Sequence, residues 1–225
     1  GTFSARSLLV TGGATLTIAG GSSLTVSETV MVTANSTILC QGKNTAAKVT
    51  NRWMGSGVTI VADRVLVDTG SRISADGQGY NAQCGPGAGK DSVYDGSGGS
   101  HGGYGGTRNP ISAPAGQILY GSPFQPVDLG SGGGNAYASS GGRGGGAIRL
   151  SVTGTLTLNG EISARGGSPT GAAGGGAGGS LWINCQTLTG SGRFVADGTS
   201  RPDNWDGGGG GRIAVYYADG SHFNS

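Results

Sequence analysis

Short runs of alternating apolar and polar residues are separated by glycine-rich segments along this chain. The clearest runs are VTIVADRVLV at 58–67 and AIRLSVTGTLTL at 147–158. Alternation with a period of two is typical of a strand with one buried face, and neither run has the spacing of an amphipathic helix. Such runs can bury apolar surface, which disordered chains generally cannot do. The pattern therefore predicts an ordered, all-β fold.

Two sequence elements recur in a fixed order. The first is RISADG, with the copies TILCQG, EISARG and RFVADG, and its apolar second residues are spaced 35, 89 and 32 residues apart: Ile38, Ile73, Ile162 and Phe194. The second is GVTIVA, with the copies GAIRLS, GSLWIN and GRIAVY, whose second residues are spaced 89, 33 and 32 residues apart: Val58, Ala147, Ser180 and Arg212. A third apolar stretch, such as TGTLTLNG, lies between the two elements. Both elements indicate a repeat unit of 32–35 residues and one interval that is far longer.

Three short strands in each unit predict a β-solenoid, in which equivalent strands of neighbouring coils pair in parallel. Each coil buries its inner face only when a neighbour covers it. A β-sandwich would not need identical strand triplets at a fixed period. We therefore expect Ile73, Ile162 and Phe194 to form one inward-facing row.

The whole chain, 1–225, is expected to form one domain. We expect tighter coils over 1–56 and regular glycine-rich coils over 57–77 and 146–217. The segment 78–145 accounts for the long interval. This segment is either a further coil in which the two recurring elements are hard to recognise, or a long loop insertion that projects from the solenoid.

Glycine occupies 51 of 225 positions, although its usual share is about 7%. It has no strict period of three, which excludes collagen. The richest segments, 140–147, 171–180 and 206–212, each lead into one of the predicted strands. If the coils stack, these crossings stack as well, and we expect them to pair through backbone groups in a polyproline II-like arrangement. Phosphate binding would need a following helix, and none is predicted.

Composition and charge exclude several classes of function. The net charge is +2 with 12% charged residues, and no basic cluster is interleaved with aromatic residues, so nucleic acid is not an expected partner. No apolar run approaches the ~20 residues of a membrane helix. Low charge and abundant serine, threonine and glycine favour a secreted or cell-surface protein, and the start GTFSARS indicates a piece of a longer chain with neighbouring domains. Three cysteines, Cys40, Cys84 and Cys185, leave room for one disulfide.

The succession GGGxGGxIxI, LTxxG and xIxAxGG over 57–217 resembles the glycine-rich right-handed β-helix repeats of large secreted or surface bacterial proteins, within the pectin-lyase-like class. The resemblance implies a right-handed parallel β-helix and an extracellular carbohydrate partner. The class includes polysaccharide lyases, glycoside hydrolases, phage tailspikes, adhesins and passive stalks, so it does not choose between cutting and holding a glycan. No catalytic motif of a particular family is present.

The long interval carries the candidate site, because loops on a rigid scaffold are where functional groups concentrate. In a polysaccharide lyase, His101 or Tyr104 would take the proton next to a uronic-acid carboxylate while Arg108 or Lys90 neutralised that carboxylate. A glycoside hydrolase would need paired carboxylates. Loop aspartates such as Asp91 are available, but aspartate favours turns for its own reasons, so this alternative is weaker.

In a binding module, exposed aromatic rings stack on the apolar faces of sugars while polar side chains bond to hydroxyl groups. The candidate ligand-binding residues are Tyr94, Tyr104, Tyr120, Tyr137, Arg108 and Trp205. No cofactor and no metal ligand set is predicted. Turn aspartates leave calcium open, although no calcium-loop motif is present.

The sequence thus favours an extracellular adhesive, carbohydrate-binding or stalk module of a larger protein. A polysaccharide lyase that uses His101, Tyr104 and Arg108 is the alternative. A tailspike-like receptor-binding fragment, which would form trimers, is the second alternative.

Overall fold

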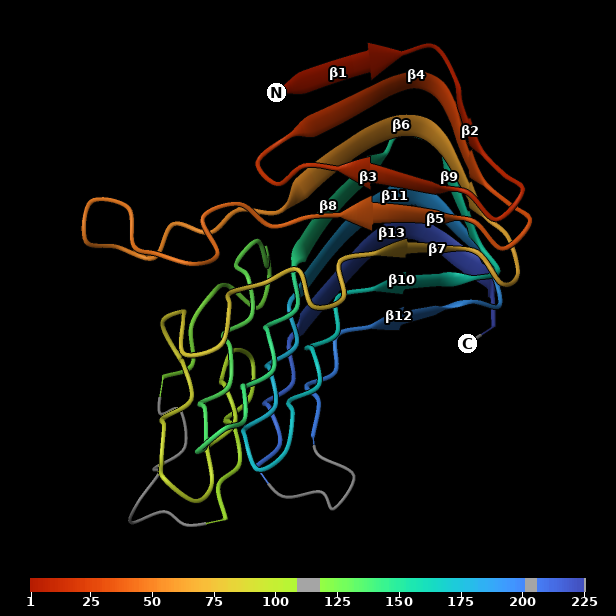
Figure 1. The fold of residues 1–225 in the computed structure, drawn as a ribbon. Helices are drawn as coiled ribbons and strands as arrows, with labels where there is room; N and C mark the ends of the chain where they lie inside the picture. The colour runs from red at the N-terminus through yellow and green to blue at the C-terminus, as the bar shows by residue number, and fades with distance from the viewer. Residues whose placement is uncertain (109–117, 201–205, 225) are drawn as a thin grey trace.

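A computed structural model describes residues 1–108, 118–200 and 206–224 of the chain. Within these ranges the structure contains strands β1 to β13 and no helix, which confirms the all-β prediction. Every strand pairing is parallel (Figure 1). This arrangement is compatible with a β-solenoid.

The strands form two sheets. The eight-stranded sheet A contains β1 (Thr2–Ala5), β2 (Leu8–Val10), β4 (Ser23–Val32), β6 (Val58–Val67), β8 (Ala147–Val152), β9 (Thr155–Leu158), β11 (Ser180–Gly190) and β13 (Arg212–Phe223). The five-stranded sheet B contains β3 (Thr15–Ile18), β5 (Thr37–Cys40), β7 (Arg72–Ser74), β10 (Glu161–Ser163) and β12 (Arg193–Val195). The chain crosses sheet A, then sheet B, and then returns to the next position in sheet A.

The predicted inward row exists in sheet B. Ile73 pairs with Ile162, and Ile162 pairs with Phe194, while Ile38 extends the row on the other side. Ile38, Ile73 and Ile162 are fully buried, and Phe194 packs against the same core. The repeat assignment is therefore confirmed. Sheet A builds the facing row from Leu24, Ile60, Leu150 and Ile183. Burying each such aliphatic side chain stabilises the fold by about 1.5–3 kcal/mol.

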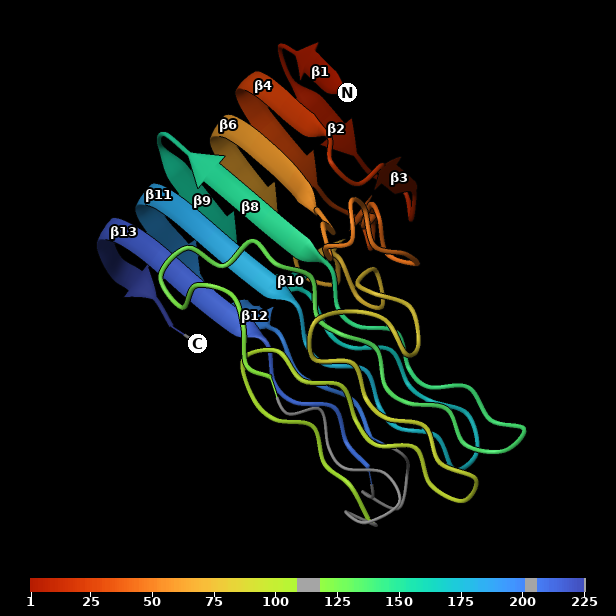
Figure 2. The ribbon, with the colours of Figure 1, turned by 90° about the vertical axis from the view of Figure 1, so that its left-hand side faces the viewer.

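The long segment between β7 and β8 adds no strand to either sheet in its described residues. Strand β6 pairs directly with β8, and β7 pairs directly with β10. The described residues of this segment instead form extended, irregular segments beside the sheets. Residues 118–129, which we call the strap, cross the starts of β11 and β13 (Figure 2). Side chains of β11 and β13 hold the strap in place: Ser180 Oγ donates to Asp128 O at 2.6 Å and Arg212 Nε donates to Tyr120 O at 2.9 Å.

The glycine-rich segments lie side by side as a bundle below the sheets, as predicted (Figures 1 and 2). In the segment 174–179, residues three apart donate their backbone N–H groups to the same neighbouring segment. The pairs are Gly174 to Gly134 with Ala177 to Ser131, Gly175 to Asp206 with Gly178 to Gly209, and Gly176 to Gly167 with Gly179 to Ala164. A period of three residues is that of a polyproline II helix, which forms no hydrogen bonds within itself. In the bundle, the backbone hydrogen bonds form between neighbouring segments instead.

Close backbone approach is the reason for glycine in this bundle. A Cβ atom on Gly145 would overlap the carbonyl oxygen of Ala164, and one on Gly176 would overlap that of Arg143. Neither glycine has a positive φ, so conformational freedom is not the requirement here. At these positions the segments pack at a spacing that leaves no room for a methyl group, and the side chains buried elsewhere in the bundle are mostly small, such as Ala173, Ala177 and Ser131.

Candidate functional site

A hollow of about 460 Å³ is formed by turns that lie, in the ribbon of Figure 2, at the end of the bundle remote from the sheets. Two turns, residues 91–95 and 135–139, lie side by side there because Ser92 and Ala136 form a β-bridge. We call this feature the tip hollow. Its lining residues are Gln83, Asp91, Ser92, Val93, Asn135 and Tyr137.

A frame of polar groups holds the tip hollow in shape. Asp91 Oδ1 accepts a hydrogen bond from the backbone N–H of Asn135 at 2.8 Å, and Asp91 Oδ2 accepts one from Gln83 Nε2. The side-chain oxygen of Asn135 accepts in turn from Gly141 N at 2.8 Å. These bonds join three different segments of the bundle. Carboxylate, amide and hydroxyl groups therefore stand in fixed positions around the hollow.

Tyr137 has an unusual backbone conformation. Its φ is +40°, in the left-handed region that favours glycine, and 91% of its surface is exposed. It is the first central residue of a tight turn closed by two bonds between Ala136 and Ser139, of 3.1 and 2.7 Å. A bulky residue in this conformation costs about 1–3 kcal/mol. The chain has 51 glycines, yet a tyrosine occupies this turn position, where glycine is the favoured residue.

The structure distributes the predicted ligand-binding tyrosines over two different environments. Tyr94 is 75% exposed in the turn next to that of Tyr137, so these two rings occupy the same end of the bundle. Tyr104 is also exposed, but its segment pairs with the crossing that leads into β13. Tyr120 is partly buried, and its hydroxyl donates to Leu129 O at 2.6 Å. Burial raises the pKa of this phenol.

Arg108 does not line the tip hollow, although it contacts Asp95 in one of the two turns that form it. Its backbone N–H donates to Asp206 Oδ1 at 2.6 Å, and its guanidinium lies 3.8 Å from Asp95. Trp205 is outside the described residues. Sequence analysis did not select Gln83, Ser92 or Asn135, because short polar residues near glycines carry no signal of their own until the folded chain brings them together.

His101 is fully buried where the bundle meets the strap. Its Nδ1 lies 2.8 Å from Gly178 O, and its ring lies 4.7 Å from that of Tyr120. Its Nε2 has no hydrogen-bond partner among the described residues. Burial lowers the pKa of His101. Because His101 is buried while Tyr104 is exposed, the structure does not bring these two side chains into one groove with Arg108.

The buried His101 predicts a dependence of stability on pH. Since its pKa is lowered in the folded state, the unfolded chain binds the proton first as the pH falls below about 6.5. We expect the free energy of unfolding to be highest above this pH and to fall by up to about 1.4 kcal/mol per pH unit between the two pKa values. Denaturant unfolding from pH 8 to pH 5 measures this loss.

The variant His101→Asn keeps a donor for Gly178 O but cannot titrate, so the loss between pH 6.5 and the folded pKa should disappear. His222 is exposed near the end of β13 and serves as the matched control. A His222→Asn variant that abolished the dependence, or a His101→Asn variant that retained it, would contradict the assignment to His101.

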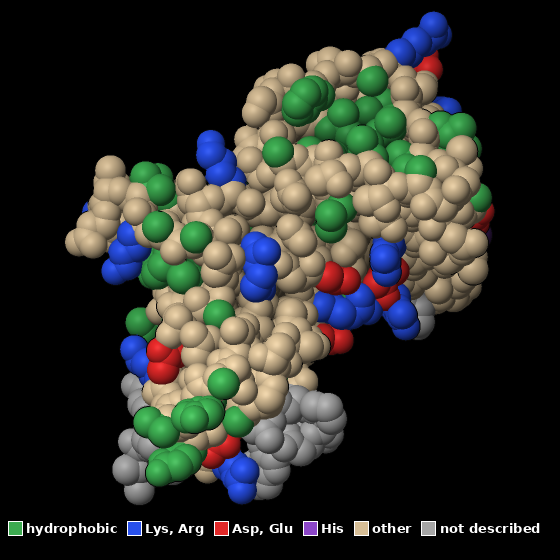
Figure 3. Space-filling model, in the orientation of Figure 1, with side chains coloured by type: hydrophobic (Ala, Val, Ile, Leu, Met, Phe, Trp, Pro, Cys, Tyr) green, Lys and Arg blue, Asp and Glu red, His purple; other side chains and the backbone are tan. Residues whose placement is uncertain are grey.

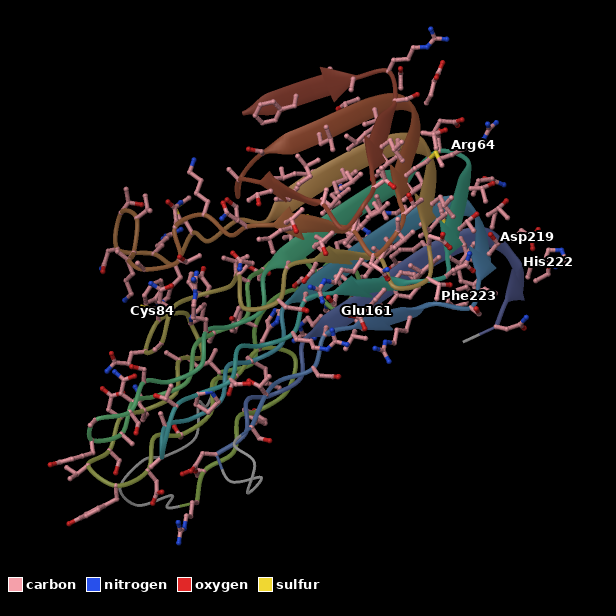
Figure 4. The ribbon with its side chains drawn as sticks, turned by 45° about the vertical axis from the view of Figure 1, so that its right-hand side comes forward. Arg64, Cys84, Glu161, Asp219, His222 and Phe223 are labelled. Carbon is pink, nitrogen blue, oxygen red and sulfur yellow. The ribbon has the colours of Figure 1, made fainter. Side chains whose placement is uncertain are left out.

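A second hollow, of about 400 Å³, lies beside an ion-pair ladder on sheet B. Glu161 accepts from Arg165 at 2.6 and 2.7 Å and from Arg193 at 2.6 Å (Figure 4). These hydrogen bonds, those from Arg165 above all, lower the pKa of Glu161 to about 2. The carboxylate is thus fully engaged by its arginines, and the ladder connects neighbouring coils.

All three cysteines are free thiols, so the disulfide left open by the sequence is not formed. Cys40 and Cys185 point into the core between the sheets, and burial raises the pKa of Cys40 to about 12. Within the described ranges, no group of three histidine, cysteine or acidic residues is arranged to hold a metal ion. The described part of the chain also has no helix with the length and hydropathy to cross a membrane.

Searches against protein-family models, curated proteins and solved structures find no match for this chain. The chemistry of the tip hollow therefore has to be read from its own residues.

Proposed function

We propose that this chain is an extracellular carbohydrate-binding module of a larger secreted or surface protein, and that the tip hollow holds the sugar. The observation that carries the proposal is Tyr137, an exposed ring in a backbone conformation that favours glycine, placed beside fixed polar groups. Backbone strain that the surrounding structure maintains is a mark of functional positions.

The groups of the tip hollow suit a pyranose sugar. The Tyr137 ring offers a flat apolar face for the C–H face of the ring, and Tyr94 in the adjacent turn can extend this platform. Asp91 has further lone pairs for sugar hydroxyls, and the amide groups of Gln83 and Asn135 supply donors and acceptors.

We further propose that the stacked coils form a right-handed β-helix. The support is the parallel pairing of equivalent strands in both sheets, because parallel crossover connections are right-handed in about 98% of cases. In this proposal the stacked sheets act as the rigid support, and the bundle carries the tip hollow away from them.

The variant Tyr137→Gly separates binding from stability. Glycine relieves the strained φ, so we expect the free energy of unfolding to stay constant or rise by about 1 kcal/mol. Loss of the ring should weaken glycan binding at least about tenfold. Binding is measured by retention on an array of neutral and acidic polysaccharides, followed by calorimetry with the best oligosaccharide.

Tyr104→Ala is the matched control, because Tyr104 is an exposed ring that does not line the tip hollow. Equal losses in both variants would remove the tip hollow from the proposal. Unsaturated uronate, detected by its ultraviolet absorbance during incubation, would establish a lyase instead. Absence of retention on every polysaccharide would leave the module a stalk.

A further inference from the structure

A protruding hairpin, residues 43–56, carries the excess positive charge of the molecule. Lys43, Lys48 and Arg52 are all exposed on it, and it contains no acidic residue. The other 11 basic residues of the chain are outnumbered by 12 acidic residues, so the remainder is net −1. We call this segment the basic hairpin. It projects to one side of the sheets (Figures 1 and 3), and none of its residues lines the tip hollow.

The three cations of the basic hairpin have no acidic partner among the described residues. Every ion pair in the described part of the chain involves other residues: Arg6, Arg64, Arg108, Arg165 and Arg193. Lys48 instead lies over the ring of Trp53, with its Nζ 5.8 Å from the ring centroid. Their full charge is therefore available to a partner.

The backbone of the basic hairpin is held in a fixed shape. Lys43 and Ser56 exchange two hydrogen bonds at its base, of 2.9 and 3.2 Å, and Val49 and Arg52 exchange two of 2.9 Å at its end. The two residues between Val49 and Arg52 both have positive φ, 47° and 60°, as a type I′ turn requires. Lys48 and Arg52 thus flank a rigid turn.

Contacts with the bundle fix the direction in which the basic hairpin points. Trp53 packs edge-on against Tyr80 with the ring centroids 5.2 Å apart, and the Tyr80 hydroxyl accepts from Gly55 N at 2.9 Å. Asn81 N donates to Thr45 O at 3.0 Å. The segment is therefore already ordered in the folded protein, so ligand binding does not carry the entropy cost of ordering it.

We infer that the basic hairpin is a second binding surface, and that its ligand is an anionic polysaccharide bearing carboxylate or sulfate groups. Three exposed cations on a projecting hairpin match a polymer with repeated negative charges, and this contact is independent of the sugar proposed for the tip hollow. The Trp53 ring is engaged by Tyr80 and Lys48, so it is not free to enter a bilayer or to stack on a nucleic-acid base.

The test measures binding of the purified chain to polygalacturonate and to heparin, with dextran as the neutral reference. We expect binding to both anionic polymers in 50 mM salt and its loss near 500 mM, because exposed charges are screened at that concentration. The triple variant Lys43→Gln, Lys48→Gln, Arg52→Gln should bind at least tenfold more weakly. Its thermal unfolding should be unchanged, since these side chains are exposed.

The control is a triple variant with the same change in net charge elsewhere: Arg6→Gln, Arg64→Gln and Arg149→Gln. If it loses as much binding as the hairpin variant, net charge and not the basic hairpin is responsible, and the inference fails. Equal or tighter binding to anionic lipid vesicles or duplex DNA would replace the polysaccharide with that partner. Tyr137→Gly should leave this binding intact, so failure of the tip hollow and failure of the basic hairpin are distinguishable.

Discussion

Replacing Gly211 with alanine is expected to destabilise the protein by about 3 kcal/mol or more. Gly211 is the last residue of the crossing that leads into β13, and a Cβ atom there would overlap the carbonyl oxygen of Gly179. The overlapping atoms are backbone, so no side chain can turn away to make room. Relief requires two segments of the bundle to separate, which breaks hydrogen bonds such as that from Gly211 N to Ala196 O at 2.7 Å.

Gly210 is the matched control, one residue away in the same crossing. A Cβ atom on Gly210 would meet nothing within 4 Å, and its φ is not in the left-handed region. We expect Gly210→Ala to change the free energy of unfolding by less than about 0.5 kcal/mol. Chemical denaturation of both variants measures the difference. Similar losses in the two variants would show that overlap with the carbonyl oxygen of Gly179 does not explain the cost of the Gly211 substitution.

The second large effect is expected in the stacked row of sheet B. Ile162 is fully buried between Ile73 and Phe194. Truncation to alanine leaves a cavity between two neighbouring coils that cannot close independently, so Ile162→Ala should cost about 2–5 kcal/mol of the free energy of unfolding. Because the row is continuous, the loss should also reduce the cooperativity of unfolding between the coils on either side.

Thr155→Ala is the control for this prediction, because Thr155 lies on the outer face of the same coil. It should cost less than about 0.5–1 kcal/mol. Urea titrations that give midpoints and slopes for both variants provide the comparison. A small loss of unfolding free energy for Ile162→Ala would mean that packing within this row contributes little to holding neighbouring coils together.

The tip hollow shows how far sequence reasoning reaches at a site. Tyr94 and Tyr137 could be selected because aromatic rings are rare in this chain and stand out among glycines. The strained φ of Tyr137 and the bonds from Asn135 and Gln83 to Asp91 could not, because they depend on two turns meeting at the end of the bundle. His101 has the same sequence context as an exposed loop residue, yet the structure buries it completely.

The strands, their period and their inward rows could be predicted from the amino-acid sequence, because alternation and repetition are local properties that any stacking of equal coils must satisfy. The sequence also indicated that the crossings pack together, since only glycine allows such an approach. Three features are evident only in the folded chain: the course of the described residues of 78–145, the burial of His101 and the separation of the three thiols. The bundle is held together by hydrogen bonds between backbone groups, which every residue carries. Which segments become neighbours therefore depends on the geometry of the whole fold, and no pattern of side chains in the sequence predicts it.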